Sequence, residues 1–210
     1  MKTEGFELGN AVALADLARK MRRYFLTVQM AYAFLFNATI ICAYWLAVIS
    51  LAFLFDLDEL LLFWVAALLI LIPVVLLAAY VSGVASPSAT SQVWRTRGKY
   101  FGLLFAVPFV ITYSMRLPPY MYSVAWYPAL AVSLLLVHVF IERESYRRGE
   151  VLAMPFLASS VLTLLTSPLI FIIVGKSPLA AWTLALSFML TSYTFAAFIA
   201  LYKARRGLVG

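Results

Sequence analysis

The sequence predicts an all-α, polytopic integral membrane protein with six transmembrane helices arranged as antiparallel hairpins. First, 65% of the 210 residues are hydrophobic, only 12% are charged and the mean hydropathy is +0.97. A soluble domain of this length has too little interior to bury so much apolar surface. Second, the chain contains six long stretches without a charged residue, and third, its basic residues gather between alternate stretches. A soluble globular domain and a disordered chain are both excluded.

Residues 1–23 form a lead-in to the first membrane span. Acidic residues interrupt this segment and its basic cluster comes last, whereas a cleavable signal peptide has a basic start followed by an apolar core. Leu14, Leu17 and Met21 recur at i, i+3 and i+7, on one face of a helix. The segment is therefore either an amphipathic helix at the cytoplasmic membrane interface or a solvated lead-in.

The six transmembrane helices follow within residues 24–203. A helix needs about 20 apolar residues to cross a hydrocarbon core of roughly 30 Å, and five of the six charge-free stretches exceed that length. The third stretch gives about 24 Å of helix and is still predicted to span. The predicted spans are residues 28–54, 60–81, 100–116, 121–141, 152–174 and 178–202, and residues 204–210 form a basic cytoplasmic tail.

The orientation follows from the distribution of lysine and arginine. Of the 16 basic residues, only Arg116 and Lys176 lie on one side of the predicted bundle. The positive-inside rule places the side that carries all the others in the cytoplasm. Both termini are therefore predicted to be cytoplasmic, and the predicted localisation is the cell membrane, in a multi-pass arrangement.

The cytoplasmic surface is the predicted place for partners. Its connections 82–99 and 142–150 are predicted to be loops that a cytoplasmic partner protein can reach. The basic residues favour anionic lipid headgroups over nucleic acid, because long apolar runs separate them. A homo- or hetero-oligomer is also compatible with the sequence. The extracytoplasmic connections are minimal and provide no outside domain for capturing a ligand.

The sequence offers little material for catalysis or metal binding. Cys42 and His138 are the single cysteine and the single histidine, which excludes a disulfide within the chain, a thiolate metal cage and multi-histidine metal or haem sites. The acidic cluster at 56–59 is either a divalent-ion site or, more simply, a solvated hairpin turn. We therefore predict no cofactor, no resident metal and no enzymatic activity.

His138 and Glu142 form a candidate pH-sensitive pair. The two residues lie four apart near the cytoplasmic end of the fourth span, so a helix brings their side chains together. They either share a proton near neutral pH or form an ordinary hydrogen-bonded pair at the interface. Glu142, like every other charged residue, is predicted to lie at a span end or in a loop, so no charge is expected inside the membrane.

Polar residues within the spans are candidates for a transport pathway. Two hydroxyl stripes recur at helical spacing, consisting of Ser159, Thr163, Thr166 and Ser167 in the fifth span and of Thr183, Ser187, Thr191 and Thr194 in the sixth. The narrowest layer of a pathway is predicted to contain Asn37, Thr163 and Thr191, with backbone carbonyls freed by Pro73 and Pro108. The alternative is that the hydroxyls form a packing seam and the prolines only shape the packing.

These features favour a permease-type transport protein, or the membrane subunit of a transporter, for a neutral or weakly polar solute. The alternative from a different class is a structural or assembly subunit of a larger membrane complex. A lipid-modifying membrane enzyme is a weaker alternative, because the sequence shows no nucleophile–base or metal constellation. The signature motifs of aquaporins, potassium channels and rhomboid proteases are absent from the sequence.

Overall fold

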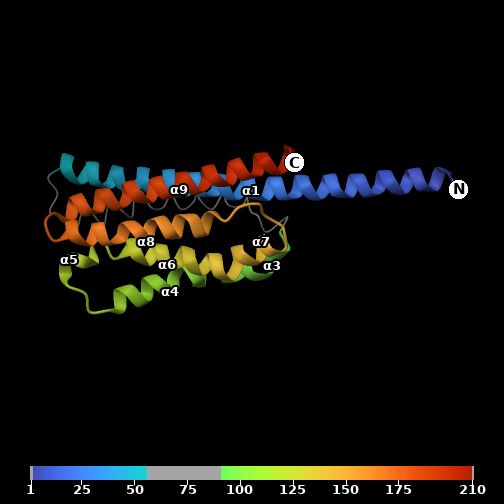
Figure 1. Ribbon diagram of the computed structural model, residues 1–210. Coiled ribbons are helices and arrows are strands. Elements are labelled where there is room, and N and C mark those ends of the chain that lie inside the picture. Colours follow the sequence, from blue (N-terminus) through green and yellow to red (C-terminus); the bar gives the residue numbers. More distant parts are fainter. Residues whose placement is uncertain (1, 56–90, 210) are drawn as a thin grey trace.

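The regular secondary structure of the described chain is entirely helical. The computed structural model describes residues 2–55 and 91–209 (Figure 1), and the all-α prediction is confirmed for these residues. The predicted second span, residues 60–81 with Pro73, and the acidic cluster at 56–59 lie outside the described residues.

Helix α1, Lys2–Leu54, is a single continuous helix of 53 residues. It contains no proline, the residue that most readily breaks a helix, and at 1.5 Å per residue it is about 80 Å long. The lead-in, from Lys2 on, and the predicted first span therefore share one helix. In Figure 1 the N-terminal part of α1 extends well beyond the end of the bundle.

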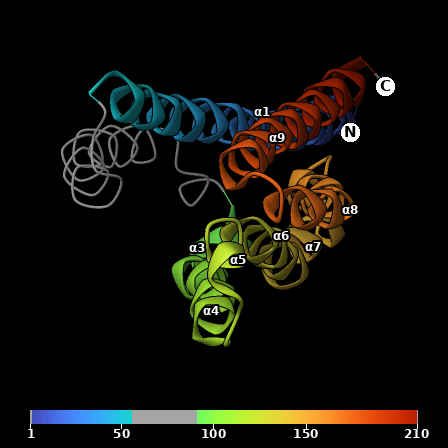
Figure 2. The ribbon, with the colours of Figure 1, turned by 90° about the vertical axis from the view of Figure 1, so that its left-hand side faces the viewer.

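The long helices lie side by side in an order that differs from their order in the chain. Helix α1 packs along α9 (Pro178–Val209), α9 along α8 (Pro155–Val174), α8 along α6 (Trp126–Val137), and α6 along α4 (Phe101–Ser114). Viewed along the bundle, they form an open arc that starts with α1 and ends with α4 (Figure 2). Neighbours in this arc run antiparallel (Figure 1). Helix α8 lies between α6 and α9.

Four described helices are long and apolar enough to cross a membrane, which suggests a multi-pass membrane protein. They are Asn10–Val48, Trp126–Arg147, Pro155–Val174 and Pro178–Leu208, and they correspond to the first, fourth, fifth and sixth predicted spans. The predicted third span, residues 100–116, contains α4, which has only 14 residues. A helix of that length reaches about 21 Å, which is less than a hydrocarbon core of roughly 30 Å.

Short helical turns lie between the long helices and at their ends. They are α3 (Gln92–Arg97), the 3-10 turn η2 (Gly98–Tyr100), α5 (Pro119–Tyr122), the π-helical turn η3 (His138–Glu142) and α7 (Arg143–Arg147). The loop prediction is thus wrong for residues 92–99, where Ser91 caps α3 by accepting a hydrogen bond from the Trp94 amide at 3.1 Å. It is also wrong for residues 142–147, because α6 continues through η3 into α7.

The helix that corresponds to the predicted fourth span, residues 121–141, begins and ends later in the chain than predicted. Residues 123–125 form a turn after α5, so α6 begins at Trp126. At its other end the helix passes Ile141 without a break and ends before Gly149, whose φ is +64°. Glu142 therefore belongs to the helix rather than to a loop.

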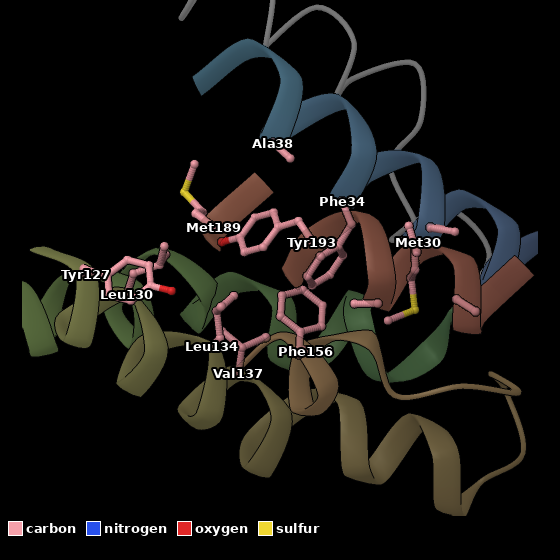
Figure 3. Close-up of a cluster of buried hydrophobic side chains, with 14 of the residues drawn as sticks. Met30, Phe34, Ala38, Tyr127, Leu130, Leu134, Val137, Phe156, Met189 and Tyr193 are labelled. Atoms are coloured by element: carbon pink, nitrogen blue, oxygen red, sulfur yellow. The ribbon is translucent and has the colours of Figure 1, made fainter. Parts of the chain in front are cut away.

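Small and aromatic side chains fill the interior of the arc. The alanines on α1 and α9 that are fully buried, and so allow close helix packing, are Ala31, Ala38, Ala181, Ala185, Ala196, Ala197, Ala200 and Ala204. Between α1, α8 and α9, the ring of Phe34 lies 4.7 Å from that of Phe156 and 5.0 Å from that of Tyr193, centroid to centroid (Figure 3). The core is therefore built from close backbones and interlocking rings.

Replacing Ala38 with Leu tests this close packing. Ala38 is fully buried, so a larger side chain should push α1 away from its neighbours at a cost of about 1–3 kcal/mol. The matched change Ala43→Leu lies at an exposed position on the same helix and should leave stability near that of the wild type. Thermal unfolding of the purified protein in detergent measures both, and equal midpoints for the two variants would contradict the packing described.

Candidate functional site

A buried carboxylate joins the end of η3 to the start of α8. Glu142 is fully buried, and its Oε1 accepts a hydrogen bond from the Phe156 amide at 2.9 Å. Its Oε2 accepts a hydrogen bond from the Leu157 amide at 3.1 Å and lies 2.8 Å from Nδ1 of His138. Glu142 was predicted to lie at a span end or in a loop, and it lies near the end of the candidate span Trp126–Arg147, within a helix and fully buried.

The start of α8 explains why a carboxylate is placed there. Pro155, its first residue, has no N–H, and the next two amides have no carbonyl of their own helix to bind. An anion satisfies these donors and interacts favourably with the positive end of the helix dipole. The four-residue spacing brings His138 and Glu142 together as predicted, and the carboxylate is fully engaged in capping α8. The sharing of a proton between the two residues near neutral pH remains a prediction.

A second carboxylate from the same segment caps α3. Glu150 Oε1 accepts a hydrogen bond from the Gln92 amide at 3.2 Å, and Oε2 accepts one from the hydroxyl of Ser91. Arg97 at the other end of α3 donates through Nη1 to the carbonyl of Phe140 at 2.8 Å. Helix α3 is thus tied at both ends to the segment that follows α6, and this polar network forms one end of the bundle.

Asn37, the first residue predicted to line a pathway, lies outside the core. Its side chain is exposed, and Nδ2 donates to the carbonyl of Ala33 in the same helix at 2.7 Å. The outward position follows from the helical repeat, because the buried face of α1 is formed by Phe34, Ala38 and Cys42.

The predicted stripe on α8 is buried, but it does not meet the predicted stripe on α9. Thr163 is fully buried, and its hydroxyl lies 3.4 Å from that of Ser192. Thr191 is exposed and donates to the carbonyl of Ser187 in its own helix at 2.8 Å. The face of α9 that meets α8 contains Ser192, and adjacent residues of a helix point about 100° apart. Thr191 therefore does not face Thr163.

The two predicted prolines have different positions. Pro108 is buried within α4, and Pro73 lies outside the described residues. Of the predicted pathway residues that are described, Thr163 and Pro108 are buried, on α8 and α4, and α6 packs between those two helices. The described structure does not bring the predicted residues together into one layer.

The cross-helix hydrogen bonds include residues that the sequence did not single out. Ser133 of α6 lies 2.8 Å from the carbonyl oxygen of Phe105 of α4, and Ser160 of α8 donates to the carbonyl of Ala131 of α6 at 2.8 Å. Both serines are fully buried. The signal available in the sequence was a small polar residue within an apolar helix, which often marks a packing face in membrane proteins.

No protein-family model, curated protein or solved structure matches this chain. Among the described residues, no group of three or more His, Cys, Asp or Glu side chains is arranged to hold a metal ion. The arrangement at Glu142 therefore has to be interpreted from its own geometry, which is that of a buried helix cap.

Replacing Glu142 with Ala should destabilise the fold by about 2–4 kcal/mol, because it removes a cap and leaves two buried amides unpaired. Glu142→Gln keeps one acceptor oxygen and should lose less. Glu144→Ala is the matched control, since that carboxylate only pairs with Arg148 at the surface, 2.7 Å from Nε. Thermal unfolding in detergent measures the three variants, and a Glu142→Ala variant as stable as Glu144→Ala would contradict the capping role.

The double change Ser133→Ala with Ser160→Ala tests the cross-helix seam. Each serine supplies one hydrogen bond between helices, and such bonds contribute roughly 0.6 kcal/mol each in membranes. We expect a loss of about 1 kcal/mol, measured by thermal unfolding. Ser187→Ala, at an exposed position bonded only to its own helix, should have no measurable effect, and an equal loss there would refute the assignment.

Proposed function

We propose that the chain is a non-catalytic membrane subunit of a larger complex and that the projecting part of α1 attaches it to a cytoplasmic partner protein. The observation that carries this proposal is that residues 10–19 are all exposed, because none of the other described helices packs over them. Figure 1 shows this part of α1 standing clear of the other helices.

The length of α1 supports a position outside the membrane for this segment. The apolar helix Asn10–Val48 has 39 residues, which is about 58 Å of helix against a hydrocarbon core of roughly 30 Å. The charge-free part begins at Tyr24. In this proposal the end of the bundle that carries Arg23, Arg148 and Arg206 faces the cytoplasm, in keeping with the positive-inside rule.

The projecting segment has two distinct faces. Leu14, Leu17 and Met21 share one face and are 66%, 56% and 38% exposed. Arg19 lies on the opposite side, and Lys20 lies on a flank of the helix, where it pairs with Asp16 at 3.9 Å. A single helix in water owes most of its stability to packing of its apolar face, so this face favours a partner with an apolar groove that receives a helix.

The permease function favoured by the sequence has less support. It required Asn37, Thr163 and Thr191 in one layer, and the exposed positions of Asn37 and Thr191 favour the alternative in which hydroxyl groups serve helix packing. A subunit role needs only well-packed helices and an outward-facing contact surface. Both requirements are compatible with the geometry of α1, α8 and α9.

The change Leu14→Glu tests the attachment. It places a charge on the apolar face of the projecting helix, so it should release the chain from its complex. The control is Val12→Glu, because Val12 is 65% exposed, close to the 66% of Leu14, but lies on the opposite face of the helix. The size of the complex extracted from the native membrane in mild detergent, measured by native gel or mass photometry, reports the result.

The wild type and Val12→Glu should be found in a complex well above the 23.5 kDa of the chain itself, and Leu14→Glu should not. Circular dichroism should show equal helix content in all three. A wild-type chain that is extracted alone, or two variants that behave alike, would refute the proposed function.

A further inference from the structure

Arg23 of α1 has no partner among the described residues. Its Nε atom is buried and makes no hydrogen bond, and no described residue forms an ion pair with its guanidinium. A buried N–H without a partner costs about 1–3 kcal/mol, and in native proteins such groups are rare. Gln29, Trp94, Trp126 and Ser145 also have a buried polar atom without a partner, but among these residues only Arg23 carries a charge, so it is the strongest candidate for a partner from outside the described chain.

The carboxylates with described side chains are all engaged elsewhere. Asp16 pairs with Lys20, Glu142 caps α8, Glu144 pairs with Arg148, and Glu150 caps α3. None of these contacts involves Arg23. Its positive charge is thus left uncompensated in the described part of the chain, at the end of the bundle where the other basic residues gather.

The turn opposite Arg23 is shaped around its guanidinium. Gly149 has a φ of +64°, and a Cβ atom at this position would lie only 2.7 Å from Nη2 of Arg23. The turn is tied to α1 because the Leu152 amide donates to Thr27 Oγ1 at 2.9 Å, and that hydroxyl donates to the Arg23 carbonyl at 2.8 Å. The left-handed backbone favours a glycine here, and without a Cβ the turn and the end of the arginine side chain come into close contact.

Helix α9 packs on the same turn and brings a further cation. Gly207 lies so close to Leu152 that a Cβ on the glycine would be 2.6 Å from Cδ1 of the leucine. Lys203 lies one helical turn before Gly207, and Arg19 one turn before Arg23, and both are exposed. Each of the two helices therefore carries an exposed cation one helical turn away from its contact with this turn.

We propose that Arg23 binds the phosphate group of an anionic ligand, either an anionic phospholipid headgroup or a soluble phosphate. A guanidinium matches phosphate oxygens with two parallel N–H bonds, and Lys203 and Arg19 add favourable charge. Tyr24 and Tyr202, the neighbours of Arg23 and Lys203 in the sequence, are of a residue type enriched at the membrane interface. The site lies on the side of α1 opposite Leu14 and does not depend on the proposed partner protein.

Binding by the purified full-length protein tests this site in two arms. One arm adds phosphatidylglycerol to the detergent micelles, with phosphatidylcholine as the comparison, and the other adds inorganic phosphate without lipid at constant ionic strength. Native mass spectrometry counts retained lipid, and the thermal midpoint as a function of ligand concentration gives the apparent affinity. The wild type should retain phosphatidylglycerol or be stabilised by phosphate. Arg23→Gln should bind about tenfold more weakly, since it loses charge-assisted hydrogen bonds.

Two further variants keep the outcome interpretable. Arg205→Gln removes an exposed cation from the other flank of α9 and should bind like the wild type. Arg23→Lys keeps the positive charge but cannot donate two parallel N–H bonds, so its apparent affinity should fall between those of the wild type and Arg23→Gln. This variant tests the site even if Arg23→Gln folds poorly. An Arg23-dependent response in the lipid arm alone identifies a headgroup, and one in the phosphate arm identifies a soluble phosphate. Binding in neither arm, or equal losses for Arg23→Gln and Arg205→Gln, would overturn the proposal.

Discussion

Helix α8 begins with a proline and two amide groups that no carbonyl of the same helix can reach, and the carboxylate of Glu142 accepts hydrogen bonds from both. Helix α8 packs on α6 on one side and on α9 on the other. The position at which α8 starts therefore determines which residues of α6 and α9 lie beside Ser160 and Thr163. The carboxyl group is tolerated in this buried position because two amides donate hydrogen bonds to it and Nδ1 of His138 lies 2.8 Å from its Oε2.

The same constraint, that buried polar groups need partners, governs the hydroxyl groups between the long helices. Ser133, Ser160 and Thr166 each bond to a neighbouring helix, and the outward-facing hydroxyls of Ser187 and Thr191 bond to carbonyls of their own helix. In lipid the second arrangement is as necessary as the first, because no water is present to satisfy an exposed hydroxyl. A polar stripe on a membrane helix is thus compatible with either a seam or a lipid-facing surface.

Length and composition were sufficient to predict the all-α class and four of the long helices, because a charge-free run of twenty residues has few other solutions. The spacing of His138 and Glu142 also predicted their contact. Thr191 was assigned to the wrong face because the choice between it and Ser192 depends on how α9 is rotated, which its neighbours decide. The burial of Glu142 was missed because it depends on where α8 starts, and α8 lies further along the chain. The close contact between Arg23 and the Gly149 turn could not be predicted either, because only the folded chain brings this turn to α1.

The pairing of α1 with α9 has a consequence for how the protein is made. The contact between Cys42 and the carbonyl of Leu186 joins residues 144 positions apart, so α1 leaves the ribosome and enters the membrane long before this partner exists. Until then α1 lacks the helix along which it packs in the folded chain, while α6 and α8 can already pair. The seam between α1 and α9 can therefore close only after α9 has been made, and a chain interrupted before α9 would lack this partner for its first helix.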